Sequence, residues 1–424
     1  MKYLSSNSIA LRKISGVFAL ALLLPLTCAF GQGTWTQKPD MPFYRNHNTG
    51  LAYNGKIYLF GGGADLTSCT NLVHEYDPET GSFTAKASMP VGLCGAAVVE
   101  FGGKIYLFGG YTAFAGEVSD AALEYDVANN TWKTLPPMLI ALGYASAVAF
   151  SSQGRIWVVG GGNAFGLAGL NEVEIYDKGT NTWSFGPPMP SGRGGLTAHP
   201  LAENWGFMIF GGSANTVVPA EDTVLLYEFF GGAWYVKKAA PTRRTLHGSA
   251  LIGGEVFLSG KVFLMGGMNP GEPVFSTVDM YDIYTDEWTS AVAPMLTARR
   301  AFVAAAVDKK IYVFGGNNES GVLKSVEVFD PGNLVTAPEP IAMTTQVSTF
   351  PNPATERIFF RFEQAVSGTL TFSRPDGTVI ITEILNREQY LEISVAGLPV
   401  GVYYWKWAGS DRAHGYTGKV LVAH

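Results

Sequence analysis

Arginine recurs at one position of a repeating pattern in this chain of 424 residues. Six equivalent positions lie four residues after Met41, Met89, Met138, Met189, Ala240 and Met295. Four of them carry arginine (Arg45, Arg193, Arg244 and Arg299) and two carry leucine (Leu93 and Leu142), while Arg243 and Arg300 flank two of the arginines. Guanidinium groups held in a fixed geometry bind carboxylate or sulfate in a bidentate manner. The pattern indicates either a site for an acidic ligand or arginines that bond backbone carbonyls and cap turns.

The elements that must position these arginines repeat every ~50 residues, a period typical of propeller blades. Each repeat has a short apolar strand ending in Gly-Gly, then Tyr-Asp or a close variant, then in most repeats an aromatic residue. The glycine pairs begin at Gly61, Gly109, Gly160, Gly211, Gly266 and Gly315. The sixth repeat has Thr336 where the aromatic residue is expected, and Trp35 at the N-terminus supplies it. A strand around Trp35 is therefore predicted to complete the last sheet and remove two open sheet edges.

This pattern resembles the kelch repeat family over residues 35–330. The resemblance implies an all-β fold, a six-bladed kelch β-propeller closed by an N-terminal strand. It also implies that the arginine position lies where the outer strand of one blade crosses to the inner strand of the next, near the mouth of a central channel. The ligand-binding candidates are Arg45, Arg193, Arg243, Arg244, Arg299, Arg300 and nearby Tyr144.

Residues 1–31 have the composition of a signal peptide. Arg12 and Lys13 precede an apolar run from Val17 to Leu26, and Ala29-Phe30-Gly31 is a small-x-small cleavage site. This run is too short for a comfortable membrane span, and no later segment is long enough. We therefore expect an exported chain with no transmembrane segment after processing.

Cys69 and Cys94 remain in the mature chain, in a compartment where a disulfide persists. The kelch resemblance places both at the seam between the first two blades, so they are a disulfide candidate. The alternative is two small buried thiols. The formal net charge of −6 argues against nucleic acid as a partner.

Catalytic patterns are weak in this sequence. The six histidines show no metal-ligand spacing, so neither a metal site nor a cofactor is predicted. Copper oxidases related to galactose oxidase need a tyrosine cross-linked to a cysteine together with histidine ligands, and here Cys94 is the one thiol near the channel face. The kelch-type N-acetylneuraminate epimerase uses arginines and acidic residues at the channel mouth. The arginines could hold an anion in that way, but no matching acid or base stands out.

The repeat stops after Asp330, and the C-terminal segment resembles the sorting domain of the type IX secretion system. Shared elements are Pro351-Asn352-Pro353, the Asp376-Gly377 turn, Leu398-Pro399 with Tyr403, and a last strand from Gly418. The resemblance implies a small immunoglobulin-like β-sandwich that carries cargo across the outer membrane of a Bacteroidetes-type bacterium. The alternative is an ordinary accessory domain of similar fold.

These observations predict four segments: a signal peptide (1–31), a six-bladed propeller (32–335), a linker (336–346) and a sorting domain (347–424). The predicted function is a secreted or cell-surface kelch-repeat binding protein. Its expected partners are the type IX secretion machinery and a protein or acidic glycan on one propeller face. The alternatives are a sugar-modifying enzyme of the epimerase type and a copper oxidase.

Overall fold

A computed structural model describes residues 32–65, 67–113, 117–164, 167–201, 206–215, 217–229, 232–253, 260–283, 285–334, 347–350, 353–409 and 415–423. The predicted signal peptide and the predicted linker lie outside these residues.

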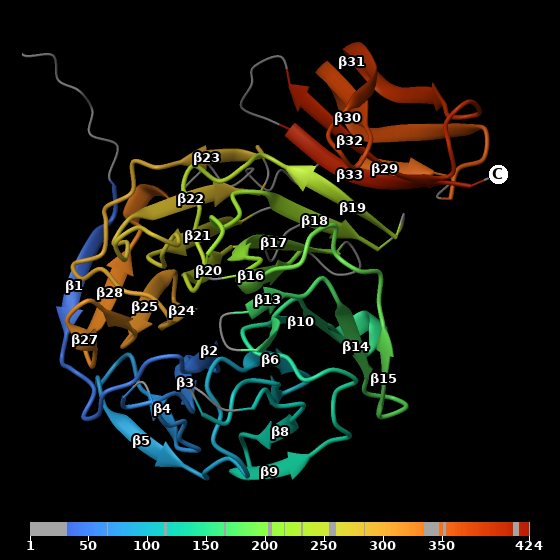
Figure 1. The fold of residues 1–424 in the computed structure, drawn as a ribbon. Helices are drawn as coiled ribbons and strands as arrows, with labels where there is room; N and C mark the ends of the chain where they lie inside the picture. The colour runs from blue at the N-terminus through green and yellow to red at the C-terminus, as the bar shows by residue number, and fades with distance from the viewer. Residues whose placement is uncertain are drawn as a thin grey trace, which may run out of the picture. The chain divides into compact units, whose positions relative to one another are not determined.

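Six four-stranded antiparallel sheets follow one another around a ring within the described part of the chain (Figure 1). The first sheet contains β2 (Thr49–Tyr53), β3 (Lys56–Phe60), β4 (Val73–Tyr76) and β5 (Phe83–Lys86). The second contains β6 (Ala97–Phe101), β7 (Lys104–Phe108), β8 (Ala122–Asp126) and β9 (Thr131–Thr134). The third contains β10 (Ser146–Phe150), β11 (Arg155–Val159), β14 (Val173–Asp177) and β15 (Thr182–Phe185). In each sheet the first strand lies nearest the centre of the ring, as predicted for propeller blades.

The fourth sheet contains β16 (Gly194–Pro200), β17 (Gly206–Ser213), β18 (Val224–Glu228) and β19 (Ala233–Lys237). The fifth contains β20 (Gly248–Ile252), β21 (Lys261–Met265), β22 (Val278–Asp282) and β23 (Glu287–Thr289). The sixth contains β24 (Val303–Val307), β25 (Lys310–Phe314), β28 (Val326–Asp330) and β1 (Thr34–Lys38). Two short hairpins lie in loops: β12 (Gly162–Ala164) with β13 (Leu167–Gly169), and β26 (Asn317–Asn318) with β27 (Gly321–Val322).

The predicted closure by the N-terminal strand is confirmed. β1 pairs antiparallel with β28, with Trp35 opposite Phe329. The two rings lie 5.0 Å apart between centroids. The Trp35 indole donates a hydrogen bond to the Ala293 carbonyl, 2.8 Å away. The first and last strands of the propeller therefore share one blade, and the ring has no open sheet edge at its seam.

The repeated aromatic residues join neighbouring blades. The indole Nε1 of Trp132 donates to the Ala87 carbonyl at 2.8 Å, and that of Trp183 donates to the Pro136 carbonyl at 2.9 Å. The same indoles pack on the tyrosine of their own blade, as Trp132 does on Tyr125 with 4.7 Å between ring centroids. Each such tryptophan therefore contributes both apolar contact and one hydrogen bond across a blade seam.

The aspartates of the Tyr-Asp pairs cap the hairpins that follow them, as the sequence predicts for scaffold residues. Asp77 Oδ1 accepts the Glu79 N–H at 2.9 Å, and Asp177 Oδ1 accepts the Gly179 N–H at the same distance. These local bonds satisfy turn donors and leave the carboxylates outside the central channel.

The C-terminal region is one bent, five-stranded sheet around its own core. Its strands are β29 (Val347–Phe350), β30 (Arg357–Ser373), β31 (Val379–Ser394), β32 (Gly401–Gly409) and β33 (Gly415–Val422). β30 pairs with β29 through its first half and with β32 through its second half. A register shift in its pairing with β31, between Arg361 and Val366, separates the halves. Phe360 and Trp405, from opposite halves, meet edge to face at 5.2 Å, so the sheet folds over one apolar core.

No helix in the described part of the chain has both the length and the apolar character needed to cross a bilayer.

Candidate ligand-binding site at the channel mouth

The first strands of the blades line a central channel with a volume of about 450 Å³. One end of it is framed by a closed ring of backbone hydrogen bonds. One residue per blade donates its N–H to the carbonyl of the equivalent residue in the preceding blade, at 2.7–2.9 Å. The ring residues are His47, Gly95, Tyr144, Gly195, Leu246 and Ala301. We call this end of the channel the mouth.

All six ring residues have left-handed backbone conformations, with φ between 49° and 67°. This conformation suits Gly95 and Gly195, but it is unfavourable for His47, Tyr144 and Leu246 because of their Cβ atoms. Backbone strain of this kind persists only where the surrounding structure holds it, and it is found most often at binding and catalytic sites. The mouth is therefore a rigid frame with side chains held in unusual directions.

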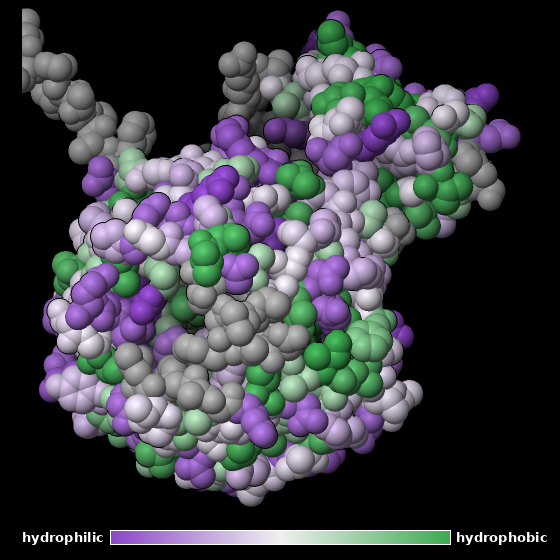
Figure 2. Space-filling view, viewed as in Figure 1, coloured by the Kyte–Doolittle hydropathy of each residue, from purple (hydrophilic) through white to green (hydrophobic). Residues whose placement is uncertain are grey.

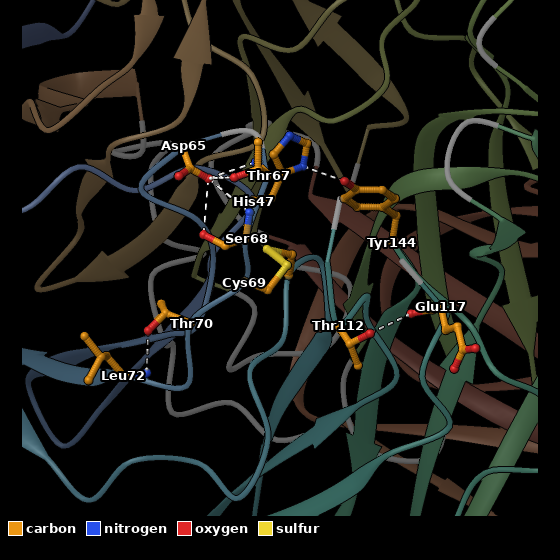
Figure 3. Close-up of a disulfide and its surroundings, with 11 residues drawn as sticks. His47, Asp65, Thr67, Ser68, Cys69, Thr70, Leu72, Thr112, Glu117 and Tyr144 are labelled. Carbon is orange, nitrogen blue, oxygen red and sulfur yellow. Dashed lines mark hydrogen bonds between the residues drawn. A yellow bond between two sulfur atoms is a disulfide. The ribbon is translucent and has the colours of Figure 1, made fainter. Parts of the chain in front are cut away.

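His47 and Tyr144 meet across the mouth although they belong to blades 1 and 3. Their Nδ1 and Oη atoms lie 2.6 Å apart in a hydrogen bond (Figure 3). The Tyr144 ring lies over Gly95, where an added Cβ would come within 2.5 Å of its Cε1 atom. Burial, together with the smaller effect of the Arg300 charge, lowers the pKa of His47 to about 3. The imidazole is therefore neutral at physiological pH.

A disulfide joins Cys69, in the loop after β3, to Cys94, at the entry to blade 2 (Figure 3). Cys94 pairs through its backbone with Tyr111, and the Tyr111 ring lies 5.0 Å from the Tyr144 ring. The same loop carries Asp65, whose Oδ1 accepts the N–H groups of Thr67 and Ser68 at 2.8 and 3.0 Å. These bonds lower the pKa of Asp65 to about 2. The disulfide thus ties an ordered turn to the tyrosines beside the mouth.

Three arginines of the repeated position lie inside the propeller wall. The side chains of Arg193, Arg244 and Arg299 are 0–1% exposed. Arg299 Nη1 donates to the carbonyls of Gly315 and Ser325 at 2.8 and 3.3 Å, and Arg244 Nη1 donates to Gly266 at 3.0 Å. Each of the three bonds carbonyls of the following blade, at the glycine pair and at the approach to the third strand. They act within the scaffold, which is the second of the two roles that the pattern left open.

Acidic residues on the third strand complete two of these three arginine sites, and they were not among the residues predicted from the sequence. Arg244 pairs with Asp279, and Arg299 pairs with Glu327. The equivalent third-strand residue is Leu123 in blade 2, where Leu93 occupies the arginine position. The repeats contain a sequence signal for these acids. When the third strands are aligned, Asp279 and Glu327 occupy the position that Leu123 occupies in blade 2, so an acid accompanies arginine and leucine accompanies leucine.

Blades 3 and 4 each have only one member of this pair. Arg193 faces a blade with Leu225 at the third-strand position, and it bonds Ser191 Oγ at 2.7 Å. Glu174 faces Leu142 instead of an arginine and accepts the N–H groups of Leu139 and Ile140 at 2.7 and 3.1 Å. Burial raises the pKa of Glu174.

The other arginine candidates differ in their surroundings. Arg45 is buried against the Phe43 ring, 4.8 Å from its centroid, and donates to the Tyr44 carbonyl. Arg243 is exposed, and its Nε lies 3.0 Å from an Asp222 carboxylate oxygen. Arg300 directly precedes the ring residue Ala301 and is half-buried. Within the described ranges no carboxylate lies within ion-pair distance of Arg300. Arg45 likewise has no ion pair among the described residues, but it is buried against Phe43, whereas half-buried Arg300 lies beside the mouth.

Polar pairs line the channel wall on blades 4 and 5. His199 Nε2 lies 2.7 Å from Ser249 Oγ, and His247 Nε2 lies 3.0 Å from Thr197 Oγ1. Burial lowers the pKa of His199 to about 4, which makes it a weak base. Among the residues that the structure describes, no group of three His, Cys, Asp or Glu side chains is placed to hold a metal ion. Cys94 is oxidised in the disulfide and so has no thiol for the tyrosine cross-link of a copper oxidase.

Hydrophilic and hydrophobic side chains are interspersed over the face of the propeller shown in Figure 2.

Comparisons with known proteins agree with this architecture. Residues 83–326 match the Attractin/LZTR1 β-propeller model, residues 45–90 match the Kelch motif, and residues 348–422 match the Secretion system C-terminal sorting domain. Kelch-like protein 25 of Xenopus tropicalis is 27% identical over 250 residues, which cover 55% of this chain and 39% of that protein. Alpha-scruin of Limulus polyphemus is 30% identical over 326 residues, covering 72% of this chain and 29% of that protein. The chain thus spans less than half the length of these relatives.

The solved structure titled "Structure of YjhT" has a similar fold, with a TM-score of 0.56 and 16% sequence identity. The similarity covers 68% of this chain and 95% of that one. At this level of identity it supports the propeller fold alone.

Proposed function

The chain belongs to the Attractin/LZTR1 β-propeller family and is a secreted kelch-repeat protein with a type IX sorting domain, and we propose that its propeller is an extracellular binding module. The ligand, a protein or an acidic glycan, binds on the face that carries the channel mouth. The C-terminal domain engages the type IX secretion machinery and delivers the propeller to the cell surface or the medium.

The observation that carries this proposal is the rigid, strained mouth. A closed ring of six backbone hydrogen bonds holds His47 and Tyr144 so that they join across the opening. The disulfide and Tyr111 support Tyr144 from one side. A surface fixed in this way loses little conformational entropy when a ligand binds, which favours affinity.

The charges of the channel favour binding over catalysis. General acid–base catalysis is most efficient when the pKa of the catalytic group lies near the working pH. His199 has a pKa of about 4 and His47 a pKa of about 3, so both are poor bases at neutral pH. The hydrogen-bonded histidines of the wall therefore suit the recognition of polar groups better than proton transfer.

The proposal is tested by immobilising the secreted chain on a surface and measuring the binding of panels of glycans and extracellular proteins. Tyr144→Ala removes the contact across the mouth and should abolish binding. The control is Arg155→Gln at the start of β11, the end of that strand opposite its glycine pair. Arg155 is exposed and pairs with Asp177, so its substitution should leave binding unchanged. A ligand that binds the Tyr144→Ala variant as well as the wild type would place the binding surface elsewhere.

A further inference from the structure

One antiparallel backbone pair per blade surrounds the mouth, directly outside the hydrogen-bonded ring. The six pairs are Asn46–Gly63, Cys94–Tyr111, Gly143–Gly162, Gly194–Ser213, Thr245–Met268 and Arg300–Asn317. Because the fold makes these positions equivalent, their side chains decide how one side of the mouth differs from another. Blades 2 and 3 bring the disulfide and the two tyrosines, whereas blades 6 and 1 bring a guanidinium and two amides.

The amides on the polar side are buried, and three of their four polar atoms have no hydrogen-bond partner among the residues that the structure describes. Asn46 is 0% exposed, and neither its Nδ2 nor its Oδ1 atom has a partner. Asn317 is 3% exposed, and its Oδ1 atom is also without a partner. Buried polar groups in folded proteins are nearly always satisfied, so an unsatisfied pair in one place calls for an explanation such as a missing ligand.

Arg300 adds a positive charge to the same side, and it forms no ion pair among the described residues. Its backbone exchanges two hydrogen bonds with Asn317, each 3.0 Å long. Its Nη1 contacts only the sulfur of Met268, which is a weak acceptor, and its Nε is buried without a partner. The nearby carboxylate of Glu319 accepts the Val274 N–H at 3.0 Å instead. The neighbouring residue Arg299 forms an ion pair with Glu327, so only one of these two adjacent arginines is paired with a carboxylate.

The charge of Arg300 reaches the residues that bridge the mouth. It lowers the pKa of His47 and opposes the burial that raises the pKa of Tyr144. Arg300 directly precedes Ala301, whose carbonyl accepts the His47 N–H at 2.8 Å, so Arg300 lies one residue from the part of the ring that holds His47.

We infer that Arg300, Asn317 and Asn46 form a subsite for the carboxylate of a sugar acid, whose ring lies towards Tyr144. A guanidinium binds a carboxylate through two parallel hydrogen bonds. An amide both donates and accepts, which matches the hydroxyl groups next to the carboxylate of a uronic acid better than it matches an isolated carboxylate. This inference rests on the proposed function of the mouth as a binding surface and names the class of ligand.

The first experiment measures the affinity of the full secreted chain for glucuronic acid and for glucose by calorimetry. The wild type should bind glucuronic acid and not glucose. Arg300→Gln should weaken the binding of glucuronic acid by about tenfold or more, since hydrogen bonds to charged groups are lost. Arg155→Gln, which removes an exposed arginine at the opposite strand end, should bind as the wild type does. Equal binding by Arg300→Gln, or no binding by the wild type, would overturn the inference.

The second experiment separates a binding residue from a structural one. Arg300→Gln should leave the melting temperature unchanged or raise it, because no carboxylate loses its partner. Arg299→Gln should lower it markedly. A similar fall for both variants would make Arg300 part of the scaffold and contradict the inference.

A third experiment distinguishes a sugar acid from an acidic peptide as the source of the carboxylate. A short glutamate-rich peptide that binds more tightly than glucuronic acid, and that also depends on Arg300, would replace the sugar acid with a peptide and overturn the assignment. The proposed function is tested separately. A partner whose binding depends on Tyr144 but not on Arg300 would contradict the sugar-acid subsite and still support the proposed function.

Discussion

Arg299 and Glu327 form an ion pair in which both side chains are fully buried between two blades of the propeller. Glu327 Oε2 also accepts the Leu296 N–H at 2.9 Å, so the carboxylate ties the crossing between blades to the third strand of blade 6. Arg244 and Asp279 repeat this arrangement one blade earlier. These pairs make the blade seams sensitive to the loss of one partner.

Arg299→Met should destabilise the protein by about 3–5 kcal/mol, because it leaves the buried Glu327 carboxylate without a counter-charge. The double variant Arg299→Met with Glu327→Leu should recover much of this loss, since an apolar pair of similar volume can replace a buried ion pair. Urea unfolding of the single and double variants measures both effects. Equal losses in the single and double variants would show that the lost stability comes from the hydrogen bonds of Arg299 to carbonyl groups and not from its ion pair with Glu327.

Leucine and arginine should be exchangeable at the repeated position only where a third-strand acid is available. Leu142→Arg places a guanidinium in the blade that holds Glu174, whereas Leu93→Arg places one opposite Leu123. Leu93→Arg should lower the free energy of unfolding by several kcal/mol, because it buries an unpaired charge. Leu142→Arg should lower it by clearly less. Thermal unfolding of the two variants tests this difference. A larger loss for Leu142→Arg would mean that the volume of the side chain outweighs its charge.

Removal of the Cys69–Cys94 disulfide should lower stability by about 3.5 kcal/mol, as the loop-closure model gives for a separation of 25 residues. The double variant Cys69→Ala with Cys94→Ala should also weaken ligand binding, because Tyr111 and Tyr144 pack beside Cys94. Unfolding with and without reductant measures the first effect and the binding assay measures the second. A reductant should change neither result in the double variant, which makes it the control.

The stability of the propeller should fall as the pH drops below 6.5. Burial lowers the pKa of His47 from 6.5 to about 3 and that of His199 from 6.5 to about 4. Both stay neutral in the folded protein while the unfolded chain takes up protons, so the stabilisation present above pH 6.5 is lost as the pH approaches the folded-state pKa values. Each such histidine contributes a slope of up to about 1.4 kcal/mol per pH unit.

His47→Asn offers a test of this dependence, because asparagine tolerates the left-handed conformation that the ring requires. The free energy of unfolding of this variant between pH 4 and 7 should change less steeply than that of the wild type. An unchanged slope would show that His47 does not contribute to the acid sensitivity.

The fold followed from the sequence because its signals are local and repeated. A glycine pair after an apolar strand, an aspartate that caps a hairpin and an aromatic residue at a constant spacing each report a short segment of backbone. The spare aromatic residue, Trp35, identified the strand that closes the ring, and the structure pairs it with Phe329. The two cysteines beside the first seam are joined as well.

The candidate site could be predicted from the sequence only in part, because the surroundings of an arginine side chain depend on residues distant in the chain. Arg299 and Arg300 are neighbours in the sequence, and the repeat places only Arg299 at the arginine position without indicating what surrounds either side chain. Arg299 is buried because Glu327, 28 residues later, lies on the strand beside it. The hydrogen bond between His47 and Tyr144 joins residues 97 positions apart.

The sequence by itself determined the repeated blade and the sorting domain, since each rests on the conformational preferences of residues close together in the chain. It also determined the closure of the ring, because Trp35 fills the aromatic position that the sixth repeat lacks. Only the tertiary structure decided which arginines belong to the wall and which one lies at the mouth. The physical reason is that burial and ion pairing depend on what the neighbouring blade supplies, and the neighbouring blade is set by the closed ring as a whole.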